Sequence, residues 1–419
     1  MPALPAVKLT NELGKPSPQG AMQARLALAV LLGATLPASA DWTHYRGPTQ
    51  NGVVAEKLPA GLKEPKQLWK INVGTGTGSV TVQGAHAFTA GNADKKNDVV
   101  FCLDIATGKT VWQHAYPQEL DPNLFEGGPR STPTIDGDRV YVQGHEGDLF
   151  CLDAATGKVK WQKNLVKDFG GKKPGWGYSG SPSIDGNTLF AEPGGSGTAT
   201  VALNKLTGAT LWKSGSEETG YASPVLADFG GKRTVILFKA KSLVGLDAKS
   251  GSELWRTDWK TDYDINAATP LVFGNHILVS SGYGTGIGLY EVGPTGLVQK
   301  WRNRSLRSHI NTPVIHQGGV FGLDGNTGGG NLVGLDLATG DKRWEEKSVK
   351  GGSLILAGDK LVVLSEKGEL VIAEATLAGF KPVLRSHVMD KRCWVQPTLN
   401  AGKLFVKNNA GDLACFEVK

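Results

Sequence analysis

Short apolar runs alternate with pairs of turn-forming residues over most of the chain. In one stretch the runs are 131–135, 139–142 and 149–152, and Asp136-Gly137 and Gly147-Asp148 separate them. Runs of this length are too short for ordinary helices, and Asp-Gly between apolar segments is a strong hairpin signal. The pattern predicts three short antiparallel strands joined by tight turns.

A fourth strand is predicted after each of these units, because a Thr-Gly turn and a tryptophan follow. The repeat reads Leu-Asp-x-x-Thr-Gly-x-x-x-Trp, for example in 103–112 and 152–161. In the second copy Asp153 can accept hydrogen bonds from backbone amides of the turn, and Gly157 can adopt the positive φ that its last position needs. Successive tryptophans from Trp112 to Trp344 are 49, 51, 43, 46 and 43 residues apart. This period is that of a β-propeller blade, about 40–50 residues.

The repeats predict an all-β fold, a single eight-bladed β-propeller of four-stranded antiparallel blades. First strands are expected near Ser79, Ser131, Ser181, Ala222, Ala268, Asn311, Gly352 and Val395. The seventh copy is degenerate at 374–380 but is still counted as a blade. The last blade lacks its fourth strand, and 67–71 from the N-terminal side can supply it and close the ring. The tryptophans expected to bury against the neighbouring blade are Trp69, Trp112, Trp161, Trp212, Trp255, Trp301 and Trp344.

These repeats resemble those of the PQQ-like, or quinoprotein alcohol dehydrogenase-like, propeller family. The family includes quinoprotein alcohol dehydrogenases and the non-enzymatic barrel-assembly factor BamB. The resemblance covers 67–419. The lead segment Trp42-Thr-His-Tyr-Arg-Gly-Pro-Thr-Gln-Asn-Gly52 is similar to the start of exported bacterial proteins of the same superfamily.

The first forty residues predict a leader with a secretory signal peptide. An apolar run of about eleven residues, Leu26 to Leu36, follows Arg25, and Ala38-Ser39-Ala40 offers small residues for cleavage after Ala40. The run is too short to span a bilayer, which takes roughly 20 residues. Met22 fits a true start. We therefore divide the chain into a leader (1–40), a lead segment (41–66) and a propeller (67–419), and we expect a periplasmic or secreted protein that does not span the membrane.

Charge and cysteines narrow the possible functions. The formal net charge is +6, and without the leader 42 basic and 38 acidic side chains leave +4, with no dense run of Lys or Arg. Nucleic acid is therefore not an expected partner. Cys102 and Cys151 occupy the same repeat position in different blades, so we expect buried thiols rather than disulfides, for Cys393 and Cys415 as well. The eight histidines share no spacing and there is no C-x-x-C motif, so no metal site is predicted.

Candidate ligand-binding residues lie just before the first strand of each blade, where a propeller places them around the mouth of its central channel. Aromatic faces, hydrogen-bond donors and two cations in this ring would suit a planar, anionic or oxygen-rich ligand. The alternative is that the aromatic side chains plug the channel. The candidates are Arg130, Trp176, Tyr178, Tyr221, Asn266, His309, Asn311, Arg392 and Trp394.

Two functions remain open from the sequence. We expect an exported, monomeric binding platform of the cell envelope, whose partners are envelope proteins or a small planar or anionic ligand. The alternative is a PQQ-dependent (quinoprotein) alcohol dehydrogenase-like oxidoreductase, with PQQ and calcium at the channel mouth. Members of that class carry a catalytic carboxylate and often an adjacent cysteine pair. This chain has no such pair and no C-x-x-C-H haem motif, and its acidic candidates, Glu218 and Asp264, lie in no motif. No catalytic residue is therefore assigned.

Overall fold

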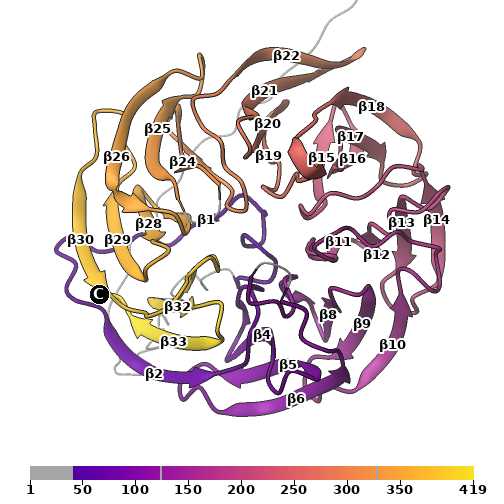
Figure 1. Ribbon diagram of the computed structural model, residues 1–419, viewed down its shortest axis with the longest axis horizontal. Helices are drawn as coiled ribbons and strands as arrows, with labels where there is room; N and C mark the ends of the chain where they lie inside the picture. The colour runs from indigo at the N-terminus through magenta and orange to yellow at the C-terminus, as the bar shows by residue number, and fades with distance from the viewer. Residues whose placement is uncertain (1–40, 123–124, 327–328) are drawn as a thin grey trace, which may run out of the picture. The chain divides into compact units, whose positions relative to one another are not determined.

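A computed structural model describes residues 41–122, 125–326 and 329–419. The predicted signal peptide, the start at Met22 and the cleavage after Ala40 lie outside these residues. The unit formed by the described residues contains eight separate sheets, mainly antiparallel, that follow one another around a ring (Figure 1). The prediction of an eight-bladed β-propeller is confirmed.

In blades 1 to 6 the strands run from the hub to the rim in chain order, whereas blades 7 and 8 each take one strand from the N-terminal side of the chain. Blade 1 contains β3 (Thr81–Gln83), β4 (His86–Asn92), β5 (Asn97–Asp104) and β6 (Thr110–Pro117). Blade 2 contains β7 (Thr134–Asp136), β8 (Arg139–Gln143), β9 (Asp148–Asp153) and β10 (Val159–Asn164). Blade 3 contains β11 (Ser183–Asp185), β12 (Thr188–Ala191), β13 (Thr200–Asn204) and β14 (Thr210–Ser214). Blade 4 contains β15 (Val225–Phe229), β16 (Lys232–Phe238), β17 (Ser242–Asp247) and β18 (Glu253–Asp258).

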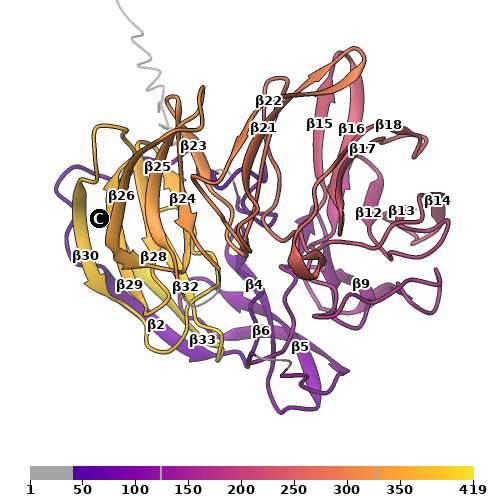
Figure 2. The ribbon, with the colours of Figure 1, turned by 45° about the horizontal axis from the view of Figure 1, so that its top comes forward.

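The second half repeats this order, and a short 3-10 helix η1 (Asp262–Asp264) precedes it. Blade 5 contains β19 (Leu271–Phe273), β20 (His276–Ser281), β21 (Gly286–Gly293) and β22 (Gly296–Asn303). Blade 6 contains β23 (Val314–His316), β24 (Gly319–Asp324), β25 (Asn331–Asp336) and β26 (Lys342–Lys350). Blade 7 contains β27 (Ser353–Ala357), β28 (Lys360–Leu364), β29 (Glu369–Glu374) and β30 (Pro382–His387). Blade 8 contains β31 (Thr398–Asn400), β32 (Lys403–Lys407) and β33 (Asp412–Glu417). Figure 2 shows the blades from an oblique direction.

The outermost strand of blade 8 comes from the N-terminal side of the chain, as predicted. β2 (Lys66–Asn72) pairs antiparallel with β33, and Trp69 is opposite Cys415. The first and last parts of the propeller therefore share one sheet. This pairing leaves no blade of the described ring without its outer strand.

Blade 7 differs from the prediction in its strand number. Its degenerate turn still leads into β30, but a fifth strand, β1 (Val53–Val54), pairs in parallel with β27 at the hub side. The lead segment therefore contributes one short strand to the propeller. Val54 is buried. Burial of its apolar side chain stabilises the pairing of β1 with the inner edge of this sheet.

Rim tryptophans join six of the eight pairs of neighbouring blades. Trp112 donates its indole N–H to the carbonyl of Ala154 at 2.9 Å, which lies in the Asp-x-x-Thr-Gly turn of the following blade. The ring lies on Gly157, whose φ is +71°, and a Cβ atom there would be 2.5 Å from the indole. Only glycine satisfies both constraints. The same indole-to-carbonyl bond, 2.8–3.1 Å long, is made by Trp69, Trp161, Trp212, Trp301 and Trp344.

Serine and threonine side chains join neighbouring blades at the hub. Each precedes the proline at the start of a first strand, and its hydroxyl accepts a hydrogen bond from the backbone N–H of the equivalent residue one blade earlier. The oxygens of Thr132, Ser181, Ser223, Thr269 and Thr312 form this belt, with N···O distances of 2.9–3.4 Å. The belt links blades 1 to 6 and satisfies backbone donors that the channel would otherwise leave unpaired.

All four cysteines are buried and have free thiols. Burial raises the pKa of Cys102, Cys393 and Cys415 to about 12. These thiols therefore stay protonated and act as small apolar core residues. Among the described residues, no helix is long and apolar enough to cross a membrane.

Replacing Gly157 by alanine tests the rim contact, with Gly137→Ala in the same blade as the control. Gly137 has a φ of +60° but nothing within 4 Å of its Cβ position. Gly137→Ala should therefore cost only backbone strain, about 1–2 kcal/mol, whereas Gly157→Ala must also displace Trp112 and should cost about 2–4 kcal/mol. Urea denaturation curves of both variants would measure this. Equal losses would contradict the tryptophan contact.

Candidate functional site

The lead segment crosses the hub of the ring. The Trp42 carbonyl accepts a hydrogen bond from Val82 N–H in blade 1, and the Thr43 carbonyl accepts one from Ile135 N–H in blade 2. Further along, the Gln50 side-chain amide donates to Ser183 Oγ in blade 3 and to the carbonyl of Pro224 in blade 4. Contacts with so many blades close the channel at the end of the hub that faces the Asp-Gly hairpins.

Arg46 fixes this segment in place. Its side chain is 1% exposed, and its guanidinium donates to the carbonyls of Thr312, Pro313 and Asn51 and to Gln396 Oε1 at 2.8–3.2 Å. Burial lowers the pKa of Arg46 to about 10, so the group stays charged at neutral pH. Its hydrogen bonds are therefore charge-assisted. The guanidinium lies directly against the Cβ position of Gly52. The Arg-Gly-Pro motif of the lead segment therefore builds a plug.

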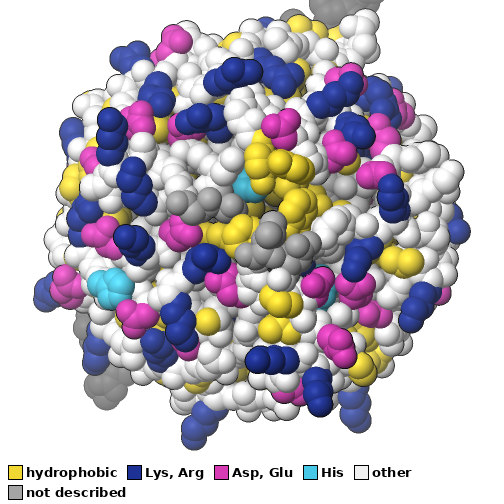
Figure 3. Space-filling model, viewed as in Figure 1, with side chains coloured by type: hydrophobic (Ala, Val, Ile, Leu, Met, Phe, Trp, Pro, Cys, Tyr) yellow, Lys and Arg dark blue, Asp and Glu magenta, His cyan; other side chains and the backbone are white. Residues whose placement is uncertain are grey.

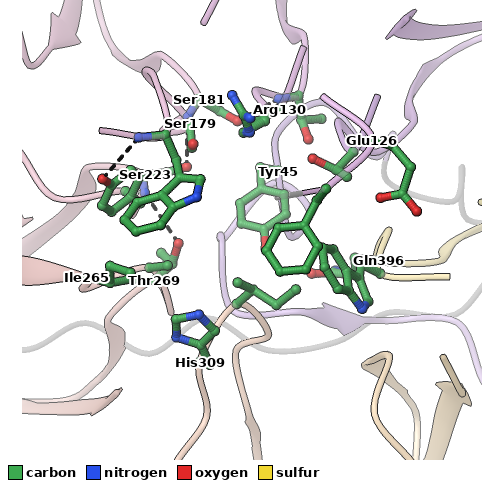
Figure 4. A pocket seen from close by; sticks show the side chains of 18 of the residues that line it. Tyr45, Glu126, Arg130, Ser179, Ser181, Ser223, Ile265, Thr269, His309 and Gln396 are labelled. Carbon is green, nitrogen blue, oxygen red and sulfur yellow. Dashed lines mark hydrogen bonds between the residues drawn. The ribbon is translucent and has the colours of Figure 1, made fainter. Parts of the chain in front are cut away.

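The plug turns the channel into a blind cup that opens on one face of the ring. The cavity has a volume of about 240 Å³, and Tyr45 from the plug lies at its centre in the close view (Figure 4). The Tyr45 hydroxyl is hydrogen-bonded to the Thr312 side chain, and burial raises its pKa. Figure 3 shows that hydrophobic side chains gather near the centre of this face and that charged side chains surround them.

One side of the cup carries a cation without a partner. Arg130 lines the cavity, and in the described part of the chain its guanidinium has no hydrogen-bond acceptor and no carboxylate within 4 Å. Its Nη1 lies 3.2 Å from the Cβ position of Gly177, so it sits under the Trp176–Gly177 turn. Burial lowers the pKa of Arg130, and the more distant Asp121 opposes that shift. Next to it the Trp176 indole N–H is buried without a partner among the described residues.

The side formed by blade 8 and the loop before blade 2 carries a satisfied network. Glu126 Oε1 pairs with Arg392 at 2.9 Å, and its Oε2 accepts from Asn409 at 3.2 Å. The Arg392 guanidinium lies 4.9 Å from the centre of the Trp394 ring, and Trp394 stacks edge-to-face with Phe125 at 4.7 Å. The Glu126 carboxylate is thus neutralised locally, and this side offers mainly aromatic surface.

His309 contributes a neutral imidazole. It is 5% exposed, its Nδ1 has no partner among the described residues, and burial lowers its pKa to about 4. Tyr283 packs edge-on against it at 4.9 Å, and Tyr263 packs against Tyr283 at 5.4 Å. Tyr263, Asp264 and Tyr283 have positive φ angles, so the lip of the cup at blades 4 and 5 is strained backbone of the kind often found at functional sites.

The structure brings five of the nine predicted residues into the cup: Arg130, Trp176, Tyr221, His309 and Trp394. Arg392 lies behind Trp394, and Asn311 lies between blades 6 and 7 in a smaller cavity. Tyr178 and Asn266 do not line the cup. The Tyr178 hydroxyl donates to the carbonyl of Pro193, and the Asn266 amide donates to three carbonyls. Both side chains thus satisfy backbone carbonyl groups of neighbouring loops.

Several residues of the cup were missed from the sequence. Tyr45 and Gln396 depend on the path of the plug, and Phe125 and Glu126 belong to a long connection between β6 and β7 with no repeat pattern. The belt residues Thr132, Ser181, Ser223 and Thr269 also line the cup. Their signal was visible as a Ser or Thr before proline in successive repeats.

The described residues do not fit a calcium site in the cup. Calcium takes six to eight oxygen ligands, usually several of them carboxylates. Glu126 is the one carboxylate of the described residues that lines the cavity, and both of its oxygens are engaged. No group of three or more His, Cys, Asp or Glu side chains among the described residues could hold a metal ion. Glu218 pairs with Lys172 and Asp264 with Lys241 instead.

The Trp-bearing blades and the cup at their hub define a PQQ-type β-propeller. The family model described as outer membrane protein assembly factor BamB matches residues 95–346, and the chain belongs to this family. No curated protein sequence matches the chain.

Solved structures of two functional kinds share the fold. BamB from Moraxella catarrhalis superposes with a TM-score of 0.64 at 18% identity, over 84% of this chain and 100% of that one. The quinohemoprotein alcohol dehydrogenase from Comamonas testosteroni gives a TM-score of 0.64 at 12% identity, over 90% and 80%. A europium-containing methanol dehydrogenase gives 0.57 at 11% identity, over 90% and 89%. Identities this low show the fold alone.

Replacing Arg46 by methionine tests the plug, with the exposed Arg304→Met as the control. Arg46→Met leaves four buried acceptors without their donor and should destabilise the protein by about 3 kcal/mol or more, whereas Arg304→Met should change stability by less than about 0.5 kcal/mol. Residues 41–52 should also become sensitive to limited proteolysis, followed by mass spectrometry. A plug that stays resistant in Arg46→Met would show that Arg46 does not hold it.

Proposed function

We propose that this protein is a rigid binding platform of the cell envelope, exported to the periplasm or secreted as a monomer. The observation that carries this proposal is the cup itself. It presents unpaired donors and aromatic surface to one face, while its one described carboxylate is tied into an ion pair. Such a site is equipped to bind, and the one free base among its described residues, the His309 imidazole, is weakened by burial, which lowers its pKa to about 4.

Membership of the family also supports a binding function. The matching family model is that of an outer membrane protein assembly factor, and the whole of the Moraxella catarrhalis BamB chain is covered by this one. Envelope proteins are accordingly the proposed partners. The face with the cup is the proposed contact surface, because the lead segment occupies the opposite end of the hub.

Site-specific photo-crosslinking tests this proposal. A photoreactive amino acid at Tyr263, which is 72% exposed beside the cup, should crosslink one or more envelope proteins in living cells. The matched position is Val298, which is 50% exposed on the rim strand β22 and should give no specific product. Identical products at both positions, or none at Tyr263, would contradict a partner surface around the cup.

PQQ-dependent alcohol oxidation is the second candidate, and the aromatic cup beside Arg130 is the observation in its favour. Trp176 and Arg130 would be the residues that hold such a planar anion, and PQQ would supply the redox chemistry. The lack of a calcium-binding carboxylate set among the described residues stands against it. We expect no alcohol-dependent dye reduction from protein supplied with PQQ and calcium, and activity that Arg130→Gln abolishes would establish this candidate instead.

A further inference from the structure

The hydroxyl belt has a second property, which concerns the cup rather than the blades. In Thr132, Ser181, Ser223 and Thr269 the oxygen already accepts a backbone N–H. Each side chain belongs to a residue at most 4% exposed that nevertheless lines the cavity. None of the four hydroxyl protons has an acceptor in the described part of the chain. A serine or threonine hydroxyl can donate one hydrogen bond, so these protons are available to a molecule in the cup.

Among the described residues, two further unpartnered groups of the cup are donors, namely the Arg130 guanidinium and the Trp176 indole N–H. The neutral His309 imidazole is unpartnered as well and can donate one hydrogen bond and accept one. The obvious acceptors are occupied, since Glu126 binds Arg392 and Asn409, and Gln396 Oε1 accepts from Arg46. Figure 4 shows Arg130, Ser181, Ser223 and Thr269 around the same cavity. A ligand rich in hydroxyl donors, such as a sugar, would find few partners here, whereas an oxyanion would find several.

The aromatic residues limit the rest of the ligand. Trp176 and Tyr221 precede blades 3 and 4 and pack edge-to-face at 6.2 Å, and Phe125 and Trp394 form a second such pair on the side of blade 8. Blades 3 and 4 lie across the eight-membered ring from blade 8. The Trp176–Tyr221 pair and the Phe125–Trp394 pair therefore face each other across the cavity at the hub. A flat apolar body between them would gain both burial and ring contacts.

We propose that the cup binds a small aromatic monocarboxylate. The carboxylate oxygens accept hydrogen bonds from the Arg130 guanidinium and from the hydroxyls of Ser181 and Ser223, and the ring lies between the two aromatic pairs. Among the described residues that line the cup, Arg130 is the one cation without a partner, and it matches one negative charge. This inference rests on the proposed binding function and names the ligand class of its site.

Titration with simple probes tests the ligand class without any mutation. Benzoate should change the tryptophan fluorescence saturably, because Trp176 and Trp394 line the cup. Benzamide, the neutral isostere, should bind at least tenfold more weakly, and benzylamine should not bind. Equal affinity for benzoate and benzamide, or no saturable binding of benzoate, would overturn the proposal.

Variants then locate the carboxylate. Arg130→Gln should weaken benzoate binding at least tenfold, Arg130→Lys should restore part of it, and Ser181→Ala combined with Ser223→Ala should weaken it severalfold. Arg304→Gln, an exposed change outside the cup, should leave it unchanged. Unchanged binding in a folded Arg130→Gln protein would place the acid elsewhere and refute the site.

Two further arms separate related explanations. A Gly-Gly-Gly-Phe peptide with a free carboxyl end carries an aromatic ring and a carboxylate, as benzoate does. Arg130-dependent binding of this peptide would identify the C-terminus of a protein chain as the source of the ligand. Binding of benzoate but not of the peptide would identify a free acid as the ligand. Crosslinking at Tyr263 does not depend on the acid. If benzoate does not bind while Tyr263 still crosslinks envelope proteins, the proposed ligand class is refuted and the proposed binding-platform function is not.

Discussion

The contact on which the ring depends is the indole of one blade lying on the Thr-Gly turn of the next. The ring and the turn are so close that only glycine fits beneath Trp112, and the indole N–H is satisfied by a turn carbonyl rather than by water. Because the bond crosses from blade to blade, it sets the spacing between sheets that share no strand. β2 extends the same contact across the chain ends, since Trp69 donates to the carbonyl of Ile105 in blade 1.

Closure at the rim leaves the hub to be built from less regular residues. There the Ser or Thr before each proline serves two purposes: its oxygen ties neighbouring blades together, and its proton points to no protein acceptor among the described residues. The plug completes the site, because Arg46 holds Tyr45 against Thr312 and closes one end of the channel. Structural hydrogen bonds thus create the donor-rich cup as a by-product of closing the ring.

The fold could be predicted from the sequence because its determining residues repeat. Period, turn chemistry and Trp69 together predicted eight blades and the closing strand, and all are present. The cup was only partly predictable. Positions before the first strands were correctly expected near the hub, but the direction of each side chain depends on its loop, which is why Asn266 caps carbonyls while His309 faces the cavity. The position of Tyr45 in the cup could not be predicted, because it depends on tertiary hydrogen bonds of Arg46, which lies outside the repeats.

The central claim is that the cup at the hub is a binding site for an acid. A crystal structure of the protein grown with 4-bromobenzoate would test it most directly, because bromine gives an anomalous signal that locates the ligand without ambiguity. We predict one strong peak inside the cup, with the carboxylate toward Arg130 and the ring between Trp176 and Trp394. A cup without bromine, or a ligand bound with its carboxylate pointing away from Arg130 and the serine hydroxyls, would contradict the account.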